Sequence, residues 1–245
     1  SDLVLRGSEP LKKEQEQLYK EYLERRISRI PVQHILGVQC FCGLDFIVTP
    51  DVLCPRLDTE VLIEEALKHI RPGSRILDMC TGSGCIILTL LHFVKNCTGT
   101  AADLSEKALA VAKQNAKKLE KECSFIHSDL FENIDGTYDV IISNPPYIAT
   151  KEIETLPPEV RIHEPMMALD GMEDGLFFYR KIVSESMNYL NSDGWLMFEI
   201  GYDQGGAVSE MMKSAGYTEV RVIKDLAGLD RVVIGKLVQE DPCYV

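Results

Sequence analysis

Hydrophobic residues recur along this chain in two spacings that alternate with each other. Short apolar and β-branched runs, such as residues 138–142, predict buried strands, whereas apolar positions three and four residues apart predict amphipathic helices. Strands are predicted at 75–79, 99–103, 124–127, 138–143, 195–200, 218–224 and 231–236. The helices predicted before and between them cover 58–70, 85–94, 105–119, 174–190 and 207–215.

This order of elements predicts the fold class. Alternating strands and helices form a doubly wound sheet with helices on both faces, here an α/β fold with a mostly parallel seven-stranded sheet. The last two strands have no clear helix between them, which predicts one antiparallel pair at an edge. In such sheets, ligands bind beyond the carboxyl ends of the strands, near the point where the strand order reverses. Functional residues are therefore expected at strand ends.

The residues before this sheet form a smaller unit. Residues 11–29 have helical spacing and end before Pro31, and residues 38–48 predict a β-hairpin around Gly43. We expect residues 1–54 to form an N-terminal helix and hairpin, and residues 55–245 to form the main domain. Within that domain, residues 148–170 contain three prolines and are predicted as a long loop.

Composition limits the function classes. The chain has 245 residues and a formal net charge of −12, which argues against broad affinity for nucleic acid. No apolar run is long enough to span a membrane and no signal peptide is recognised, so a cytoplasmic location is expected. Eight cysteines without a C-x-x-C pair favour reduced, mostly buried thiols over a zinc or disulfide framework, and no metal site is predicted.

A glycine-containing turn follows the first strand of the sheet. Gly82 and Gly84 let the backbone approach a ligand and turn into a helix, while Thr81 lies between the strand and the first glycine. The third glycine of a dinucleotide fingerprint is replaced by Ile87, so a pyrophosphate is not well supported. Asp78, just before the turn, suits the ammonium group of an amino acid. The alternative is a tight turn without a ligand.

Acidic residues also end the next two strands. Asp103 could accept hydrogen bonds from ribose hydroxyls, although it could instead cap the following helix, as could Ser105. Asp129 could accept a hydrogen bond from an adenine amino group, with Leu130 or Phe131 against the ring. Together with the glycine turn, these positions describe a site for an adenosine that carries an amino-acid tail.

The strand at 138–143 ends in the sequence Asn144-Pro145-Pro146-Tyr147. Prolines cannot continue a strand ladder, so the sheet ends here and leaves carbonyl acceptors beside the side-chain amide of Asn144. Such a rigid ledge, with an aromatic ring beside it, suits a flat group that carries N–H donors, such as a primary amide or an exocyclic amine. The alternative is a proline strand terminator without a ligand.

With these clusters the chain resembles the class I S-adenosylmethionine methyltransferases, a Rossmann-like fold, and within them the branch that methylates amino groups. Two groups share the Asn-Pro-Pro-Tyr signature: DNA adenine N6-methyltransferases and the protein N5-glutamine methyltransferases of the HemK/PrmC family, which act on peptide-chain release factors. The resemblance to the second group extends from about residue 29 to residue 236. Further stretches that carry it lie at 31–37, 55–60, 168–171, 174–176, 199–205 and 224–233.

The resemblance implies a reaction and a set of contacts. A methyl group would pass from S-adenosylmethionine, leaving S-adenosylhomocysteine, to the side-chain nitrogen of the glutamine in the Gly-Gly-Gln loop of a release factor. Asn144 Oδ1 and the Pro145 carbonyl would hold the amide, Tyr147 would pack on it, and no metal is implied. Arg56 and Glu60 would close over the site, or would alternatively form an ion pair at a helix end. The implied substrate-binding residues are Arg56, Glu60, Asn144, Pro145, Pro146 and Tyr147.

The chain departs from the family pattern in three places. Cys80 stands where the family usually has glycine, Leu57 stands where it has proline, and the family's larger N-terminal helical domain is represented by one long helix. Two other interpretations remain open on the residues: a nucleic-acid adenine N6-methyltransferase, and a non-catalytic protein that binds an adenosine ligand.

Overall fold

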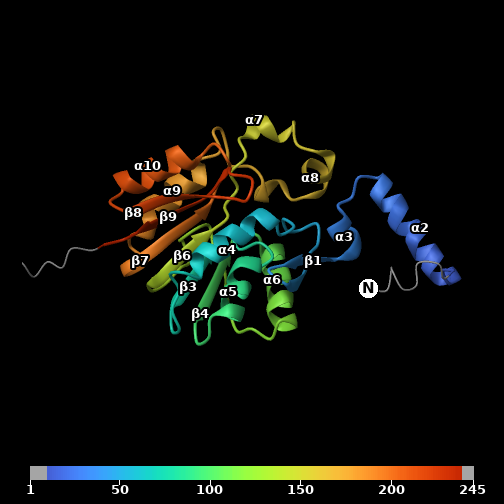
Figure 1. Ribbon diagram of the computed structural model, residues 1–245, viewed down its shortest axis with the longest axis horizontal. Coiled ribbons are helices and arrows are strands. Elements are labelled where there is room, and N and C mark those ends of the chain that lie inside the picture. The colour runs from blue at the N-terminus through green and yellow to red at the C-terminus, as the bar shows by residue number, and fades with distance from the viewer. Residues whose placement is uncertain (1–9, 239–245) are drawn as a thin grey trace, which may run out of the picture.

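A seven-stranded sheet forms the centre of the computed structural model, which describes residues 10–238 (Figure 1). The strands, in their order across the sheet, are β5 (Ser124–His127), β4 (Thr98–Asp103), β3 (Arg75–Met79), β6 (Tyr138–Ser143), β7 (Leu190–Glu199), β9 (Asp230–Lys236) and β8 (Thr218–Lys224). The chain starts the sheet at β3, adds strands on one side, and then returns to place β6 on the other side. The strand order therefore reverses at β3, because β4 lies on one side of it and β6 on the other. A ligand site is expected at this point.

The sheet is parallel except at one edge. β3 pairs in parallel with β4 and β6, and β6 pairs in parallel with β7. β9 lies between β7 and β8 and is antiparallel to both. The predicted α/β class and the predicted antiparallel pair are thus confirmed, and the structure adds that the last strand inserts inside the edge.

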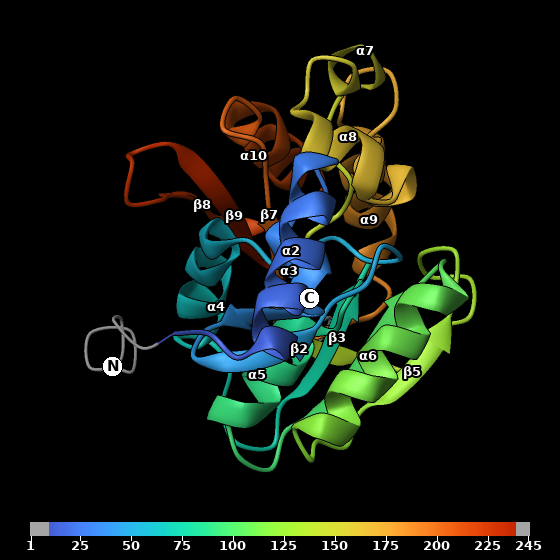
Figure 2. The ribbon, with the colours of Figure 1, turned by 90° about the vertical axis from the view of Figure 1, so that its right-hand side faces the viewer.

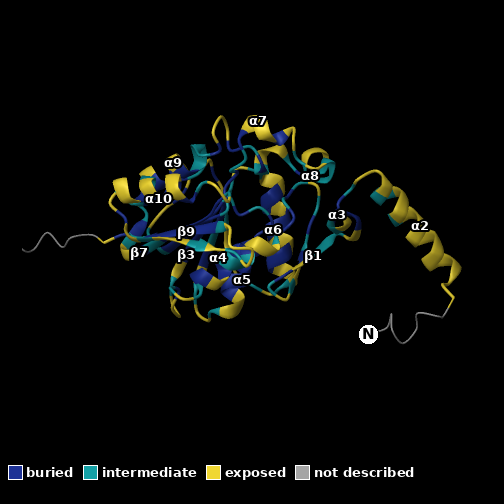
Figure 3. Cartoon of the chain, turned by 45° about the horizontal axis from the view of Figure 1, so that its top comes forward, coloured by how far each residue is buried: buried dark blue, intermediate teal, exposed yellow. Residues whose placement is uncertain are grey.

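Two hydrophobic cores cover the two faces of the sheet. Neighbouring residues of one strand point to opposite faces, so Ile76 belongs to one core and Leu77 to the other. The helices of the first core are α4 (Glu60–Ala66), α5 (Cys85–Phe93) and α6 (Glu106–Lys118). The helices of the second core are α9 (Phe177–Ser186) and α10 (Gly205–Ser214). Figure 3 shows the inner strands between them mostly as buried, such as β9.

The prediction of a long loop at 148–170 was wrong in part. The segment holds α7 (Thr150–Ile153), α8 (Pro158–His163) and the 3-10 helix η2 (Met166–Ala168). Pro158 is the first residue of α8, a position where a missing N–H costs nothing because no intrahelical partner exists there. Prolines that suggested irregular chain therefore begin a short helix.

Several helix ends also differ from prediction. α9 begins at Phe177 rather than residue 174, because Asp174 accepts a hydrogen bond from the N–H of Leu176 and pairs with Arg180 instead of entering the helix. α4 ends at Ala66, four residues before the predicted end at 70, and residues 67–69 continue as a turn. Such ends depend on local side-chain contacts that spacing alone does not reveal.

The N-terminal unit contains α2 (Lys13–Ile27), α3 (Val32–Leu36) and a hairpin of β1 (Val38–Phe41) and β2 (Leu44–Ile47). α2 has no buried residue and extends away from the sheet in Figure 1. Its last turn comes beside α8, where Arg26 and Arg29 pair with Glu159 at 2.9 and 3.1 Å (Figure 2). Within residues 10–238, no helix is long and apolar enough to cross a membrane.

The hairpin is packed more closely on the main domain than its position in the sequence suggests. Phe41 and Phe46 belong to the first core, and the backbone of Ile47 exchanges two hydrogen bonds with the side chain of Asn115 on α6. The two segments on either side of residue 54 therefore share one core, and the domain boundary at that residue remains a prediction. Seven of the eight cysteines are described and all are free thiols, whereas Cys243 lies outside the described residues.

Candidate functional site

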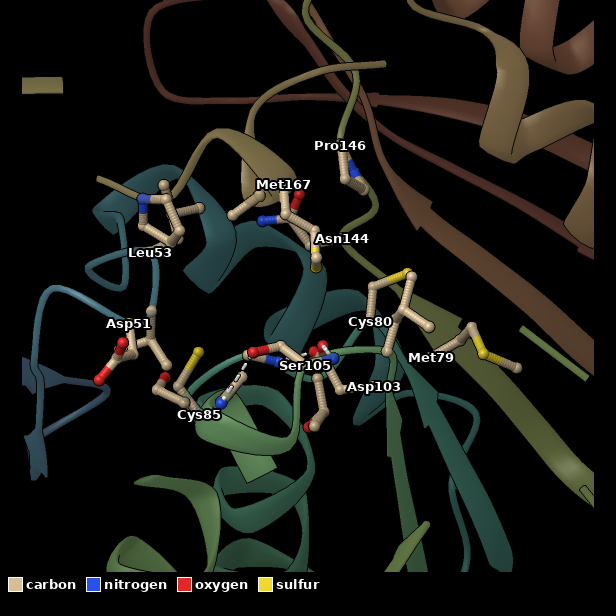
Figure 4. A pocket seen from close by; sticks show the side chains of 18 of the residues that line it. Asp51, Leu53, Met79, Cys80, Cys85, Asp103, Ser105, Asn144, Pro146 and Met167 are labelled. Atoms are coloured by element: carbon tan, nitrogen blue, oxygen red, sulfur yellow. Dashed lines mark hydrogen bonds between the residues drawn. The ribbon is translucent and has the colours of Figure 1, made fainter. Parts of the chain in front are cut away.

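A cavity of about 300 Å³ lies beyond the carboxyl ends of β3, β4, β5 and β6. This is the edge of the sheet where the strand order reverses, and the volume lies at the lower end of the range for small-ligand sites. Figure 4 shows Asn144 and Met167 on one side of the cavity, with Asp103 and Ser105 opposite. Predicted site residues that line the cavity are Arg56, Thr81, Gly82, Asp103, Asp129, Leu130, Asn144 and Pro146.

The turn after β3 forms one wall of the cavity. Gly82 has a φ of +55°, and an added Cβ would meet no atom within 4 Å, so this position is open to a ligand. Gly84 also has a positive φ, +79°, but a Cβ there would lie 3.2 Å from the side chains of Ala112 and Leu88. Its close approach is to helix α6, and it does not line the cavity. Gly84 thus has a packing role in the structure, and its contact with a ligand stays a prediction.

Asp78 lies beneath the turn. Its side chain is fully buried and is not part of the cavity lining, and its contact with a ligand ammonium group stays a prediction. Its Oδ2 accepts hydrogen bonds from the hydroxyl of Thr81 at 2.6 Å and from the N–H of Ile87 at 3.3 Å. Burial raises the pKa of Asp78 to about 7. This residue holds the turn in place from behind.

Asp103 lies at the end of β4 and faces the cavity. Its Oδ2 accepts a hydrogen bond from the N–H of Gly82 and its Oδ1 accepts one from the N–H of Ser105, both at 2.8 Å. Burial raises its pKa, and these two N–H donors oppose that shift. A carboxylate has about four acceptor sites, so Asp103 keeps capacity for ligand hydroxyls. The N-cap of α6 is Ser105, whose side chain accepts from the N–H of Ala108. Asp103 is therefore not the cap of this helix.

The hydroxyl of Ser128 helps to hold the loop after β5. Ser128 Oγ donates to the carbonyl of Leu130 at 2.7 Å and accepts from the N–H of Asn133 at 3.0 Å. Leu130 has a φ of +48°, an uncommon conformation for a non-glycine residue. Asp129 and Leu130 both line the cavity, as their predicted contact with an adenine ring requires.

The Asn-Pro-Pro-Tyr segment is divided between the cavity and the protein interior. Asn144 and Pro146 line the cavity, whereas Pro145 and Tyr147 do not. The hydroxyl of Tyr147 donates to Glu199 Oε1 at 3.3 Å, and burial raises the pKa of Tyr147. This contact fixes the hydroxyl end of Tyr147, and the packing of its ring on a substrate amide stays a prediction.

Arg56 and Glu60 have separate partners. Arg56 lines the cavity and pairs at 2.6 Å with Glu164, whose side chain is only 1% exposed. Glu60 lies outside the lining, and its Oε1 accepts a hydrogen bond from the N–H of Cys42 in the hairpin turn. The alternative Arg56–Glu60 ion pair is not formed, whereas the closing role of Glu60 stays a prediction. Arg56 instead connects the cavity rim to the segment between α8 and η2.

Sequence reasoning missed part of the site. Two residues lie behind or beside Asn144: Thr59 lines the cavity, and Glu199 is buried at the end of β7. Glu199 could have been found as an acidic residue at a strand end, by the same rule that found Asp103. The other lining residues come from loops folded over the cavity from elsewhere in the chain, and include Asp51, Leu53, Met167 and Phe178.

Known proteins match this chain along almost its whole length. A methyltransferase small domain model matches residues 56–170, and a PrmC N-terminal domain model matches residues 1–37. The chain is 43% identical to a release factor glutamine methyltransferase of Geobacter sulfurreducens over 236 residues, which cover 96% of this chain and 83% of that protein. It is 42% identical to one of Caulobacter vibrioides over 240 residues, with 96% and 83% covered.

Solved structures show the same fold at low identity. A methyltransferase from Pyrococcus furiosus matches with a TM-score of 0.63 and 19% identity, over 88% of this chain and 99% of that one. A 16S rRNA N2 G1207 methyltransferase from Thermus thermophilus, solved with AdoMet and guanosine, matches with a TM-score of 0.58 and 13% identity, over 82% of this chain and 49% of that one. These likenesses support the predicted methyltransferase fold.

Proposed function

Because the chain belongs to the family of release factor glutamine methyltransferases, we propose that it transfers a methyl group from S-adenosylmethionine to the side-chain amide nitrogen of a release-factor glutamine. The glutamine meant is the one in the Gly-Gly-Gln loop. A protein substrate of this kind is met in the cytoplasm, where translation takes place.

The observation that carries this proposal is the placement of Asn144. It follows the last residue of β6 and lines the cavity, with its Nδ2 directed to the hydroxyl of Thr59 at 3.5 Å. The amide oxygen Oδ1 is then available to another donor. A primary amide substrate brings two N–H donors, and one of them suits Oδ1. We assign the second to the backbone carbonyl of Pro145. This residue is not part of the cavity lining, but it lies between Asn144 and Pro146, which both are.

The residues of the cavity fit an adenosine with an amino-acid tail. Gly82 leaves open space beside its backbone, and Asp103 retains acceptor capacity for ribose hydroxyls. Asp129 and Leu130 line the part of the cavity after β5, where an acceptor and an apolar surface suit adenine. S-adenosylmethionine bound there would supply an electrophilic methyl group on its sulfonium. The nitrogen–methyl bond would form as the sulfur–methyl bond breaks, with that electron pair remaining on sulfur and one proton passing from the nitrogen to water.

The task of the protein residues is to make a poor nucleophile react. The nitrogen lone pair of an amide is delocalised into the carbonyl, so it must be held in line with the methyl while positive charge develops on the nitrogen. Asn144 Oδ1 and the Pro145 carbonyl stabilise that charge by accepting from the two N–H groups, and they orient the nitrogen at the same time. The described residues contain no cluster that could hold a metal ion, and the proposed chemistry uses none.

The proposal is tested by mass spectrometry of a peptide-chain release factor after incubation with the protein and S-adenosylmethionine. We expect one added methyl group on the glutamine of the Gly-Gly-Gln loop, and none when that glutamine is replaced by glutamate. A parallel reaction contains duplex DNA in place of the release factor.

Each other outcome points to a different function. Methyl transfer to DNA, with none to the release factor, would overturn the proposal in favour of an adenine N6-methyltransferase. Calorimetry with S-adenosylmethionine separates the third interpretation: binding without transfer to either substrate would indicate a non-catalytic protein that binds an adenosine ligand.

A further inference from the structure

The Asn-Pro-Pro-Tyr segment is anchored at its first end by the sheet. Ser143, the last residue of β6, pairs with Met79 of β3 and Phe198 of β7, and its hydroxyl donates to the carbonyl of Met79 at 2.6 Å. Beyond this anchor, Pro145 and Pro146 have no N–H and offer only their carbonyls to backbone partners. Their rings fix φ but not ψ, and the ψ of Pro145 sets where its carbonyl points. That carbonyl keeps one direction only if the far end of the segment is also held.

Gln204, at the beginning of α10, holds that far end. Its Nε2 donates to the carbonyl of Tyr147 at 2.9 Å and to the carbonyl of Gly175 at 3.2 Å. Its Oε1 accepts from the N–H of Gly201 at 2.9 Å. The nitrogen of a side-chain amide only donates and its oxygen only accepts, so these three partners fix the orientation of the Gln204 side chain. Gln204 therefore joins the Asn-Pro-Pro-Tyr segment to the turn after β7 and to the loop before α9.

Two glycines let the loop before α9 close on the same backbone. A Cβ on Gly171 would lie 2.8 Å from the Cα of Tyr147 and 2.9 Å from the carbonyl oxygen of Pro146. A Cβ on Gly175 would overlap the carbonyl oxygen of Tyr147. The N–H of Gly171 also donates to the carbonyl of Ile148 at 2.8 Å. Neither glycine can carry a side chain unless the segment moves.

We propose that Gln204 is a positioning residue for methyl transfer: by holding the carbonyl of Tyr147, it fixes the direction in which the Pro145 carbonyl points. This inference rests on the proposed function, in which the Pro145 carbonyl accepts one N–H of the substrate amide. Gln204 does not line the cavity. It affects the rate through the backbone between Ser143 and Tyr147, whose two ends are held by the sheet and by the Gln204 amide.

Steady-state methylation of the release factor by Gln204→Glu tests the inference. Glutamate keeps the length of the side chain and an acceptor for Gly201, but its ionised carboxylate has no donor for Tyr147. We expect kcat to fall by more than about tenfold, while the Kd for S-adenosylmethionine and the KM for the release factor change by less than about threefold. The kcat is expressed per binding site counted by calorimetry with S-adenosylmethionine, so that a loss of folded protein does not lower it. A Gln204→Glu variant with the kcat of the wild type would overturn the proposal.

Gln114→Glu is the matched control. Gln114 is exposed on α6 and lies outside the cavity lining, so its replacement should leave kcat unchanged. Equal losses of kcat in Gln204→Glu and in this control would overturn the positioning role.

Gly171→Ala tests the same backbone from the opposite side. The added methyl group meets the backbone of Tyr147, so kcat should again fall by more than about tenfold, whereas an unchanged kcat would overturn the proposal. Gly206→Ala on α10 is its control, because a Cβ there meets no atom within 4 Å, and it should have the kcat of the wild type. If Gly171→Ala does not fold, Gln204→Glu decides alone.

A second measurement does not depend on turnover. Tyr147-Ile148 is the only Tyr-Ile pair in the chain, so protein with ¹³C in its tyrosine carbonyls and ¹⁵N in its isoleucines gives one carbonyl signal, from Tyr147. This signal should shift in Gln204→Glu but not in Gln114→Glu, and an unshifted signal would overturn the hold. If the wild type transfers no methyl group, the proposed function fails, while the signal still decides whether Gln204 holds the segment.

Discussion

The carboxylate of Asp103 accepts a hydrogen bond from the backbone N–H of Gly82 at 2.8 Å. This contact connects the end of β4 to the turn after β3, the two neighbouring elements at one side of the cavity. Gly82, whose backbone is open to a ligand, and Asp103, whose carboxylate faces the cavity, are therefore joined by a direct hydrogen bond. A ligand that approaches Gly82 meets Asp103 in a fixed position.

Asp103→Asn should weaken the binding of S-adenosylmethionine. The amide has one oxygen in place of two, so it cannot accept from Gly82, Ser105 and two ribose hydroxyls together. Hydrogen bonds to a charged group contribute about 1.5–3 kcal/mol, which predicts a rise in Kd of about tenfold or more. Isothermal titration calorimetry measures this, with Asp45→Asn on the exposed part of the hairpin as control. A Kd equal to that of the wild type would contradict the assignment of Asp103.

Asn144→Ala should separate binding from transfer. Asn144 is assigned to the substrate amide, so its loss should leave the Kd for S-adenosylmethionine within about threefold. The rate of methyl transfer should fall by about a hundredfold or more, as when one hydrogen-bonding group at a developing charge is removed. Single-turnover methylation of the release factor gives the rate. Asn188→Ala, at an exposed position after α9, should behave as the wild type. Transfer at the original rate by Asn144→Ala would rule out the amide clamp.

Cys80→Gly should improve affinity at little cost in stability. Cys80 lines the cavity and has a φ of +61°, a conformation that glycine adopts freely. Relief of this strain is offset by the greater freedom of glycine in the unfolded chain, so the free energy of unfolding should change by less than about 1 kcal/mol. The Kd for S-adenosylmethionine should fall because a side chain leaves the cavity wall.

Cys80→Val provides the opposite change at the same position. A β-branched residue is a steric outlier at positive φ, so urea unfolding should show a loss of about 1–2 kcal/mol or more. If Cys80→Gly binds S-adenosylmethionine no more tightly than the wild type, the thiol does not crowd the ligand.

Asp78→Asn should change how stability depends on pH. Burial raises the pKa of Asp78 to about 7 in the folded protein, above about 3.9 in the unfolded chain. The folded state then binds the proton more tightly, so this residue favours folding most below pH about 4, and its contribution falls as the pH rises to about 7. Asparagine does not titrate. The free energy of unfolding of the wild type relative to Asp78→Asn should therefore decline between about pH 4 and pH 7, then level off.

Urea unfolding of both proteins across that pH range measures the difference. The other buried carboxyl groups with raised pKa values, Asp103, Glu164 and Glu199, are common to both proteins and cancel in the comparison. A difference that stays constant with pH would contradict the burial of an ionisable group at this position.

Two predicted site residues make contacts that only appear on folding. Asp78, at a strand end, has the residue type and position of a ligand contact, but its side chain points behind the turn to Thr81 and Ile87. Tyr147 follows the prolines as an aromatic platform requires, yet its hydroxyl is drawn to Glu199. In each case the contact depends on the direction in which the side chain points. Packing against residues distant in the sequence sets that direction.

The sequence by itself determined the class of fold, the seven strands, the antiparallel edge and the strand ends that carry the site. These features follow from the period of apolar residues and from prolines and glycines, whose effects act on near neighbours in the chain. Only the tertiary structure decided that Asp103, Asp129 and Asn144 share one cavity while Asp78, Glu60 and Tyr147 lie outside it. Only the structure placed Thr59 and Glu199 behind Asn144, because the partners of a buried polar group come from strands and turns far apart in the sequence.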